Sequence, residues 1–339
     1  MKAKTVIKIL GNRKQALRFE YGQDYVFVAD PACTDYDWLV VYDELPSDDC
    51  GTYRNGCERL RCPREHTILL TGEPVSIKRY SRAYTRQFAH LLTNRPYEAE
   101  RHPGYRLGRG YYYWFNDRDY VESSRPVAVP KTKVISACCS AKQMRHTRHA
   151  DRFALMKALA SGVPDFDWFG RGVRGFGKKY EILDPYCYHV AVENHVAPHH
   201  WSEKIADAFL CECLPFYAGD PALTEVFPAE SFIPIPIDDP QEAVRIVRAA
   251  IAAGEYERRR EAVLEAKRRI LEKYNFWAQV ISVIESAPAE VSDPAAVAAK
   301  IYSRRTLRRH SLPAALEDLW GHAADAVRQL FSREGKSIS

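Results

Sequence analysis

The chain has 339 residues, of which 46% are hydrophobic and 27% charged, and its formal net charge is +5. This composition is ordinary for a globular protein of two domains and excludes a disordered or fibrous chain. Because acidic and basic residues are interleaved along most of the sequence, the small positive charge does not indicate a nucleic-acid-binding protein.

The sequence has no apolar stretch of membrane-spanning length. Its first apolar run, Thr5–Leu10, is interrupted by Lys8 and is also too short for a signal peptide. Nine cysteines are scattered without the pair spacing of a structural zinc site, which fits a reducing compartment. We therefore expect a cytoplasmic protein.

Strands and helices alternate in the first part of the chain. Runs rich in β-branched and aromatic residues predict strands at Val6–Leu10, Tyr25–Ala29, Trp38–Tyr42 and Thr67–Leu70, and a helix over Tyr84–Leu92. Residues 95–116 are rich in Tyr, Arg, Gly and Pro and predict irregular structure. The charges and prolines of residues 117–130 predict an interdomain linker.

The alternation resumes after this linker. Strands are predicted at Lys133–Ser136, Asp167–Phe169, Tyr188–Val192 and Leu214–Tyr217, with helices over Asp151–Ala160 and Glu203–Cys211. The pattern predicts an α/β protein with two parallel sheets flanked by helices, over residues 1–125 and 126–290, and a helical tail over 291–339. Ligands of such sheets bind beyond the carboxyl ends of the strands.

One segment of about fifty residues carries a recognisable motif. The strand Tyr188–Val192 runs into Glu193-Asn194, Trp201-Ser202-Glu203-Lys204 follows at a helix start, and Pro228 to Ile233 reads Pro-Ala-Glu-Ser-Phe-Ile. This order and spacing resemble the donor-binding signature of the GT10 α-1,3-fucosyltransferases of bacterial type. That signature has a strand ending in Phe-Glu-Asn, a Tyr-x-Thr-Glu-Lys helix start and a Pro-x-x-Ser-Phe-Ile step. Val192, Trp201 and Ser202 are read as replacements of the family's Phe, Tyr and Thr.

The resemblance extends to both halves of the chain. Leu70-Thr71-Gly72-Glu73-Pro74 resembles the family's acceptor-domain motif, and Val134-Ile135-Ser136 with Arg152 and Asp167–Arg171 resembles its entry into the donor domain. It implies the GT-B architecture, in which two Rossmann-like domains face each other across a cleft, here an acceptor domain and then a GDP-sugar domain. It also implies an inverting transferase that moves L-fucose from GDP-fucose to a GlcNAc-containing, lactosamine-type glycan, with an α-1,3 linkage.

The residue types fit such chemistry. A departing diphosphate needs preorganised positive charge, which a helix N-terminus, Lys204 and Arg152 can supply. Carboxylates such as Glu193 and Glu203 can accept hydrogen bonds from sugar hydroxyls. Solvated helix charges for the cations, and a cap or salt-bridge role for Glu193, remain alternatives. By resemblance, the donor-binding residues are Ser136, Arg152, Arg171, Tyr188, Glu193, Asn194, Trp201, Ser202, Glu203 and Lys204.

Glu73 is the candidate catalytic base. Inversion needs a base on the acceptor side of the sugar, and partial burial would tune Glu73 for that task; a helix-capping glutamate is the alternative. Since cations already supply charge neutralisation, we expect no metal ligands and no essential cofactor, with Mg²⁺ or Mn²⁺ at most stimulatory. A core role for Trp201, instead of stacking on the donor, is also open.

The tail combines basic and amphipathic features. Arg304, Arg305, Arg308 and Arg309 precede apolar residues at helical spacing. This pattern suits either peripheral binding to an anionic membrane surface or packing on the enzyme or on a second copy in a homodimer. Two other functions stay open: a transferase for a different nucleotide sugar, and a non-catalytic GT-B protein that binds glycan or membrane.

Overall fold

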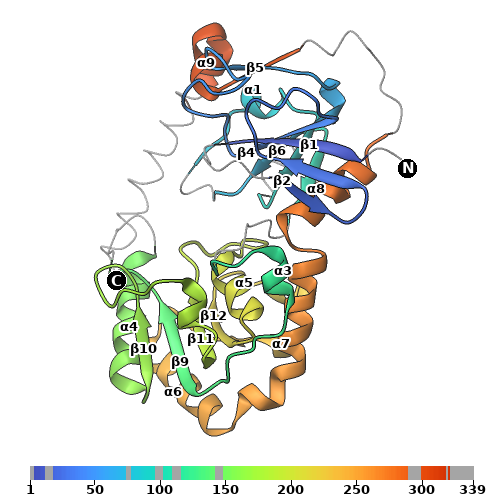
Figure 1. Ribbon diagram of the computed structural model, residues 1–339. Coiled ribbons are helices and arrows are strands. Elements are labelled where there is room, and N and C mark those ends of the chain that lie inside the picture. Colours follow the sequence, from blue (N-terminus) through green and yellow to red (C-terminus); the bar gives the residue numbers. More distant parts are fainter. Residues whose placement is uncertain are drawn as a thin grey trace. The chain divides into compact units, whose positions relative to one another are not determined.

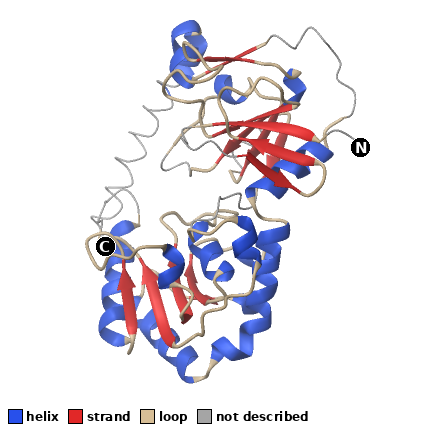
Figure 2. Ribbon diagram, viewed as in Figure 1, coloured by secondary structure: helices blue, strands red, loops and turns tan. Residues whose placement is uncertain are grey.

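The computed structural model describes residues 4–11, 18–73, 78–95, 102–108, 116–141, 148–288, 299–317 and 320. The chain divides into two compact units (Figure 1). The first unit combines residues 1–108 with 280–339, and the second consists of residues 109–279. Each unit is built on its own sheet (Figure 2).

The sheet of the first unit has seven strands in the order β2-β3-β1-β4-β6-β7-β8. All neighbouring strands pair in parallel except β2 with β3. Every residue of β6 is buried and so are four of the five in β4, as expected for parallel strands covered on both faces. The strands are β1 (Thr5–Leu10), β2 (Arg18–Tyr21), β3 (Tyr25–Val28), β4 (Trp38–Tyr42), β6 (Thr67–Thr71), β7 (His90–Thr93) and β8 (Tyr105–Leu107).

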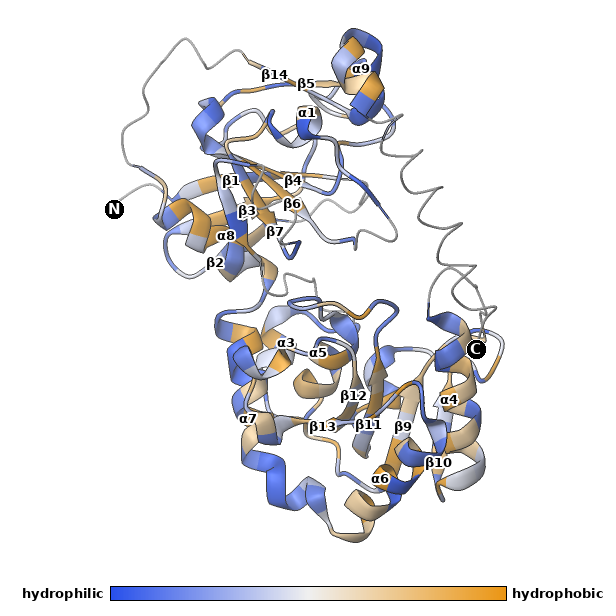
Figure 3. Ribbon diagram, turned by 180° about the vertical axis from the view of Figure 1, so that it is seen from behind, coloured by the Kyte–Doolittle hydropathy of each residue, from blue (hydrophilic) through white to orange (hydrophobic). Residues whose placement is uncertain are grey.

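The sheet of the second unit has five parallel strands in the order β10-β9-β11-β12-β13. Its strands are β9 (Lys133–Cys138), β10 (Phe166–Phe169), β11 (Tyr186–Val192), β12 (Leu214–Ala218) and β13 (Ile233–Pro234). Helices α4 (His149–Gly162), α5 (Glu203–Leu210), α6 (Pro240–Ala252) and α7 (Glu255–Glu272) surround it, and α8 (Phe276–Glu285) leads out of the unit. Figure 3 shows hydrophobic strands inside and hydrophilic residues along α7. The predicted α/β class is confirmed.

Two sequence-based element predictions need correction. The predicted helix over Tyr84–Leu92 is wrong beyond Thr85, because α1 (Arg82–Thr85) is short and His90–Thr93 forms β7. Within residues 95–116, predicted to be irregular, residues 105–107 form β8, while 96–101 and 109–115 lie outside the described residues. Sheet pairing with β6 overrides the local helix preference of this stretch.

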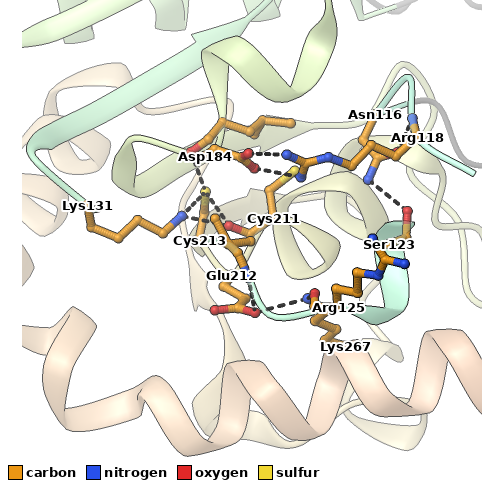
Figure 4. Close-up of polar contacts among 12 residues, drawn as sticks. Asn116, Arg118, Ser123, Arg125, Lys131, Asp184, Cys211, Glu212, Cys213 and Lys267 are labelled. Carbon is orange, nitrogen blue, oxygen red and sulfur yellow. Dashed lines mark hydrogen bonds and ion pairs between the residues drawn. The ribbon is translucent and has the colours of Figure 1, made fainter. Parts of the chain in front are cut away.

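The segment predicted as an interdomain linker belongs to the second compact unit, which begins at residue 109 and not at the predicted 126. Figure 4 shows its polar contacts. The segment contains α3 (Tyr120–Ser124), whose N-terminus is capped by a capping box between Asp119 and Glu122. Arg118 donates to both oxygens of Asp184, and the buried Lys267 donates to the carbonyl of Arg125 at 2.7 Å. Arg118 thus pairs with a buried carboxylate 66 residues further along the chain, a contact that composition cannot predict.

The predicted tail of residues 291–339 is not a separate element where the structure describes it. β14 (Lys300–Tyr302) pairs antiparallel with β5 (Cys57–Arg59), so this segment belongs to the first unit. Ile301 is 1% exposed and joins the core of that unit. Helix α9 (Arg304–His310) follows, and residues 312–317 are again helical. A three-residue strand among arginines leaves too little periodicity to be predicted.

No helix among the residues that the structure describes has both the length and the apolar composition needed to cross a membrane.

Candidate functional site

The carboxyl end of the second sheet gathers most of the predicted site residues. Strands β9, β10, β11 and β12 are hydrogen-bonded neighbours that run in the same direction, so the loops after them emerge at one edge. Glu193 and Asn194 directly follow β11, and helix α5 begins at Glu203 after the intervening loop. This edge is where open parallel sheets bind ligands.

Glu193 is the buried centre of the arrangement, with 1% of its surface exposed. Its carboxylate accepts the backbone N–H of Ser202 at 2.9 Å and the Ser202 hydroxyl at 2.6–2.8 Å. Ser202 is the N-cap of α5, and its Oγ accepts the backbone N–H of Lys204 at 3.3 Å. Glu193 therefore ties the N-cap residue of α5 to the end of β11.

Lys204 carries its ammonium group into the same cluster. Its Nζ lies 3.3 Å from Glu193 Oε2, 3.0 Å from Glu203 Oε1 and 2.9 Å from Ser202 Oγ. Burial opposes the charged ammonium, but the carboxylates of Glu193 and Glu203 outweigh it and raise the pKa of Lys204. The cation is thus held at the N-terminus of a helix, where anions bind.

A second lysine, which sequence reasoning missed, lies beside this cluster. Lys179 begins a short 3₁₀ turn, Lys179–Ile182, and its Nζ is 2.5 Å from Asp207 Oδ2 on α5. Burial favours a neutral Glu203, but Lys204 and Lys179 together lower the pKa of this carboxyl to about 2. Glu203 is therefore ionised at neutral pH. Since Asp207 follows Lys179 by 28 residues, no local motif signals the pair.

Arg152 approaches the cluster from helix α4. It is 6% exposed, it donates to the side-chain oxygen of Asn194, and its Nε has no hydrogen-bond partner among the described residues. Burial raises the pKa of the nearby Cys139 thiol, while the charges of Arg152 and Lys204 act in the opposite direction. Lys179 and Lys204 thus pair with the carboxylates of Glu193, Glu203 and Asp207, and Arg152 adds a third cation beside Asn194.

Three predicted donor-binding residues lie elsewhere. Ser136 is fully buried in mid-strand, where its hydroxyl and His189 Nδ1 are 2.8 Å apart. Burial lowers the pKa of His189 to about 3, so this pair is a neutral core contact. Tyr188 lies in the first half of β11, where its hydroxyl accepts the N–H of Tyr256 at 2.9 Å. Both side chains are therefore structural.

Trp201 is also a core residue, which corrects its assignment to donor stacking. It is 1% exposed and packs edge-on against Phe227 and Tyr274. In the Tyr-x-Thr-Glu-Lys motif the tyrosine stands three residues before the glutamate, which is the position of His200 in this chain. His200 is 7% exposed and meets His195 edge-on. When Glu203 is aligned with the glutamate of the motif, His200 and not Trp201 stands at the position of the tyrosine.

Arg171 is exposed in the turn after β10, and its carbonyl accepts the N–H of Ala141, which follows β9. It therefore lies at the carboxyl edge, as predicted, without a described side-chain contact to the cluster.

The candidate base Glu73 lies in the first unit, directly after β6. The N–H of the preceding Gly72 donates to Asp43 Oδ1 at 2.8 Å, and Arg95 donates to the Glu73 carbonyl. The side chain of Glu73 is exposed, so the partial burial expected from the sequence is not present in this unit. Pro74, which follows it, is outside the described residues.

Two hollows lie at the amino ends of strands, one in each unit. One of about 690 Å³ is lined by residues around Arg64 and His102, and another of about 590 Å³ by residues around Lys133 and Asp167. Both lie near the amino ends of strands, and neither is lined by the Glu193 cluster. Since parallel sheets bind ligands at their carboxyl ends, we place the candidate site at the cluster.

Within the described ranges, His, Cys, Asp and Glu side chains form no group of three or more that could hold a metal ion. In two Asp-x-Asp patterns, Asp35-Tyr36-Asp37 and Asp117-Arg118-Asp119, one carboxylate accepts a backbone N–H from a distant part of the chain. Asp37 accepts the N–H of Val6, and Asp117 accepts the N–H of Lys179.

Comparison with known proteins identifies the fold. No family model matches the sequence, and no curated protein matches it. A crystal structure of an α1,3-fucosyltransferase superposes with a TM-score of 0.51 at 15% identity, over 88% of this chain and 93% of that chain. The chain has the GT-B fold.

Other GT-B matches are weaker. An α1,3-fucosyltransferase structure with GDP-fucose gives a TM-score of 0.47 at 14% identity, over 86% of this chain and 93% of that one. The Anabaena protein HepE in complex with UDP-glucose gives 0.43 at 12% identity, over 67% and 72%.

Proposed function

We propose that this GT-B protein is an inverting glycosyltransferase that moves L-fucose from GDP-fucose to a hydroxyl of a GlcNAc-containing, lactosamine-type oligosaccharide, with an α-1,3 linkage. The observation that carries the proposal is the buried Glu193–Ser202–Lys204 cluster, with Arg152 beside it, at the carboxyl edge of the second sheet. The fucosyltransferase motif of the sequence spans this same cluster.

In this proposal the cations bind the diphosphate. Lys204 lies in the first turn of α5, where backbone N–H groups and the helix dipole favour negative charge, and Arg152 adds a second cation beside Asn194. The three cations and three carboxylates balance one another, so an arriving diphosphate competes with Glu203 for Lys204. As the glycosidic bond breaks, the leaving diphosphate gains charge, which these positioned cations stabilise.

The carboxylates serve the sugar. Because Glu203 is ionised at neutral pH, it can accept hydrogen bonds from fucose hydroxyls or stabilise positive charge at the anomeric carbon, but it cannot donate a proton. The acceptor hydroxyl needs a base on the opposite face, and Glu73 is the proposed group. Its exposed position on the first unit leaves it accessible to an oligosaccharide.

The donor assignment is tested by calorimetric titration with GDP and with UDP, first without divalent metal and then with Mg²⁺. We expect GDP to bind without metal and Lys204→Ala to weaken it about 10- to 100-fold, because a charge-assisted contact contributes roughly 1.5–3 kcal/mol. Lys157→Ala, an exposed lysine on α4, is the matched control and should bind normally.

Three other results would change the assignment. Binding of UDP without GDP would replace fucose by another nucleotide sugar, and binding of neither would favour a non-catalytic GT-B protein. Glu73→Gln should bind GDP normally yet lose transfer; retained transfer would remove Glu73 as the base.

We also propose that residues 312–320 bind an anionic membrane surface. Leu312, Leu316 and Trp320, four residues apart, are 73%, 46% and 76% exposed, and Arg305 and Arg309 of α9 are exposed nearby in the chain. Cosedimentation with vesicles should show binding to phosphatidylglycerol and little to phosphatidylcholine, and Trp320→Ser should weaken it. A dimer in light scattering without vesicle binding would assign the stripe to a second copy.

A further inference from the structure

An arginine of the C-terminal segment reaches the loop that carries the proposed base. Arg304 is the first residue of α9, where Ser303 caps the helix by accepting the N–H of Thr306 at 3.2 Å. Its Nη1 lies 2.8 Å from Glu44 Oε1, and the other oxygen of Glu44 is 3.2 Å from Lys78 Nζ. The Arg304 side chain is 17% exposed, so solvent screens this pair less than an ordinary surface pair.

Glu44 follows the residue that shapes the carboxyl end of β4. Asp43 has a left-handed backbone with a φ of 62°, and its Oδ1 accepts the N–H of Gly72 and the hydroxyl of Tyr80. Gly72 immediately precedes Glu73. The chain of contacts therefore runs from Arg304 through Glu44 and Asp43 to the backbone beside the proposed base.

Tyr80 joins the same chain from the other side. Its ring is 8% exposed, and the guanidinium carbons of Arg95 and Arg304 lie 4.8 and 5.8 Å from its centre. Cations over an aromatic face are attracted to it and hold the ring in place. The ring in turn directs its hydroxyl onto Asp43.

The C-terminal segment holds this region at two more points. Glu317 accepts the N–H groups of Arg82 and Ala83 at 2.7 and 3.2 Å, which caps the start of α1. Gln87 exchanges two hydrogen bonds with the backbone of Tyr302, at 2.9 and 3.0 Å. The backbone from Tyr80 to Gln87 is thus fastened to residues 302–317.

We propose that Arg304 is a positioning residue for catalysis: it fixes Glu44, Asp43 and Tyr80 so that Gly72 presents Glu73 in one orientation. The inference deepens the proposed function and rests on it for the role of Glu73. It also gives Arg304 a role that Arg305 and Arg309 do not share, because their side chains are exposed on the same helix.

The kinetic test compares three variants of the full-length enzyme with GDP-fucose and a lactosamine acceptor. Arg304→Gln should lower kcat about 10- to 100-fold, because a reacting group displaced by an ångström loses that much, while KM for GDP-fucose stays unchanged. Arg304→Lys, which keeps one charge, should recover part of the loss. Arg305→Gln, whose proposed role is membrane binding and not transfer, is the matched control and should keep the wild-type kcat in this assay without vesicles.

Hydrogen exchange tests the same idea without requiring activity. The amide of Gly72 should exchange faster in Arg304→Gln than in the wild type or in Arg305→Gln, because its acceptor Asp43 is released. Unchanged exchange, or unchanged kcat in Arg304→Gln, would overturn the proposal. A wild-type enzyme inactive with every nucleotide sugar would instead overturn the proposed function, and exchange alone would then decide whether Arg304 holds the loop.

Discussion

Glu203 shows how single residues at the edge of the second sheet acquire their charge state. Its side chain is 27% exposed, and its carboxylate lies 3.0 Å from the ammonium group of Lys204, with Lys179 close by. These ammonium groups overcome burial and lower its pKa from 4.5 to about 2. A carboxyl whose pKa is lower in the folded state than in the unfolded chain stabilises the fold whenever it is ionised in both.

We therefore predict a pH-dependent stability difference between the wild type and Glu203→Gln. The contribution of Glu203, roughly 2–3 kcal/mol, should be complete above pH 4.5 and should disappear as the pH falls towards 2. Urea unfolding of both proteins at several pH values measures it. The exposed Glu230→Gln is the control, and a wild-type advantage constant from pH 6 to pH 2 would contradict the prediction.

Sequence reasoning succeeded at residue scale where neighbours in the chain are neighbours in space. Glu193, Ser202 and Lys204 meet because a strand end and a helix start lie nine residues apart, and the motif records that spacing. Sequence reasoning failed for residues whose role depends on whether the side chain is buried. Trp201 and Tyr188 are the residue types that a nucleotide site uses, but their rings fill the core, and sequence does not show which way a side chain points.

At the scale of elements, the turn after β12 depends on a residue without a side chain. A Cβ built on Gly219 would lie 2.2 Å from the hydroxyl oxygen of Tyr217 and 2.6 Å from Cγ of Glu193. The backbone directly after β12 can therefore pass close to the buried Glu193 side chain only because residue 219 is a glycine.

Gly219→Ala is predicted to push Glu193 away from Ser202. We expect a loss of stability of about 1–3 kcal/mol, as for other overpacked sites, and weaker GDP binding. Thermal unfolding and calorimetry measure the two effects. Gly175→Ala is the control, because a Cβ at Gly175 meets nothing within 4 Å. Wild-type GDP affinity in Gly219→Ala would show that Glu193 has no part in binding.

Elements were predicted best where the pattern is long. The runs that became β4 and β6 are apolar over at least three consecutive residues, as expected for strands buried on both faces. Short elements such as β8 and β14 owe their conformation to a partner strand, and nothing in three residues specifies that partner.

At the scale of the whole molecule, the C-terminal segment is part of the first unit. β14 completes a two-stranded sheet with β5, and Ile301 fills the core. The sequence left open whether this segment binds a membrane or packs on the enzyme. For residues 299–317 the structure shows packing on the first unit.

Truncation separates the two parts of this segment. Removal of residues 299–339 should destabilise the first unit by at least about 2 kcal/mol, since burying a side chain such as Ile301 contributes roughly that much, and should abolish transfer. Removal of residues 321–339 leaves these contacts in place and is the control. Limited proteolysis should then cut the first unit faster in the protein that lacks residues 299–339 than in the one that lacks residues 321–339. Equal resistance in the two proteins would contradict the prediction.

The discontinuous first unit also has a consequence for biosynthesis. Residues 109–279 leave the ribosome together and can fold as a unit, but β5 must wait for β14, which is translated about 240 residues later. At about 5–20 residues per second the delay is on the order of 10–50 s. During that interval the nascent first unit carries an unpaired strand edge and an uncovered apolar surface, which are the features that chaperones bind.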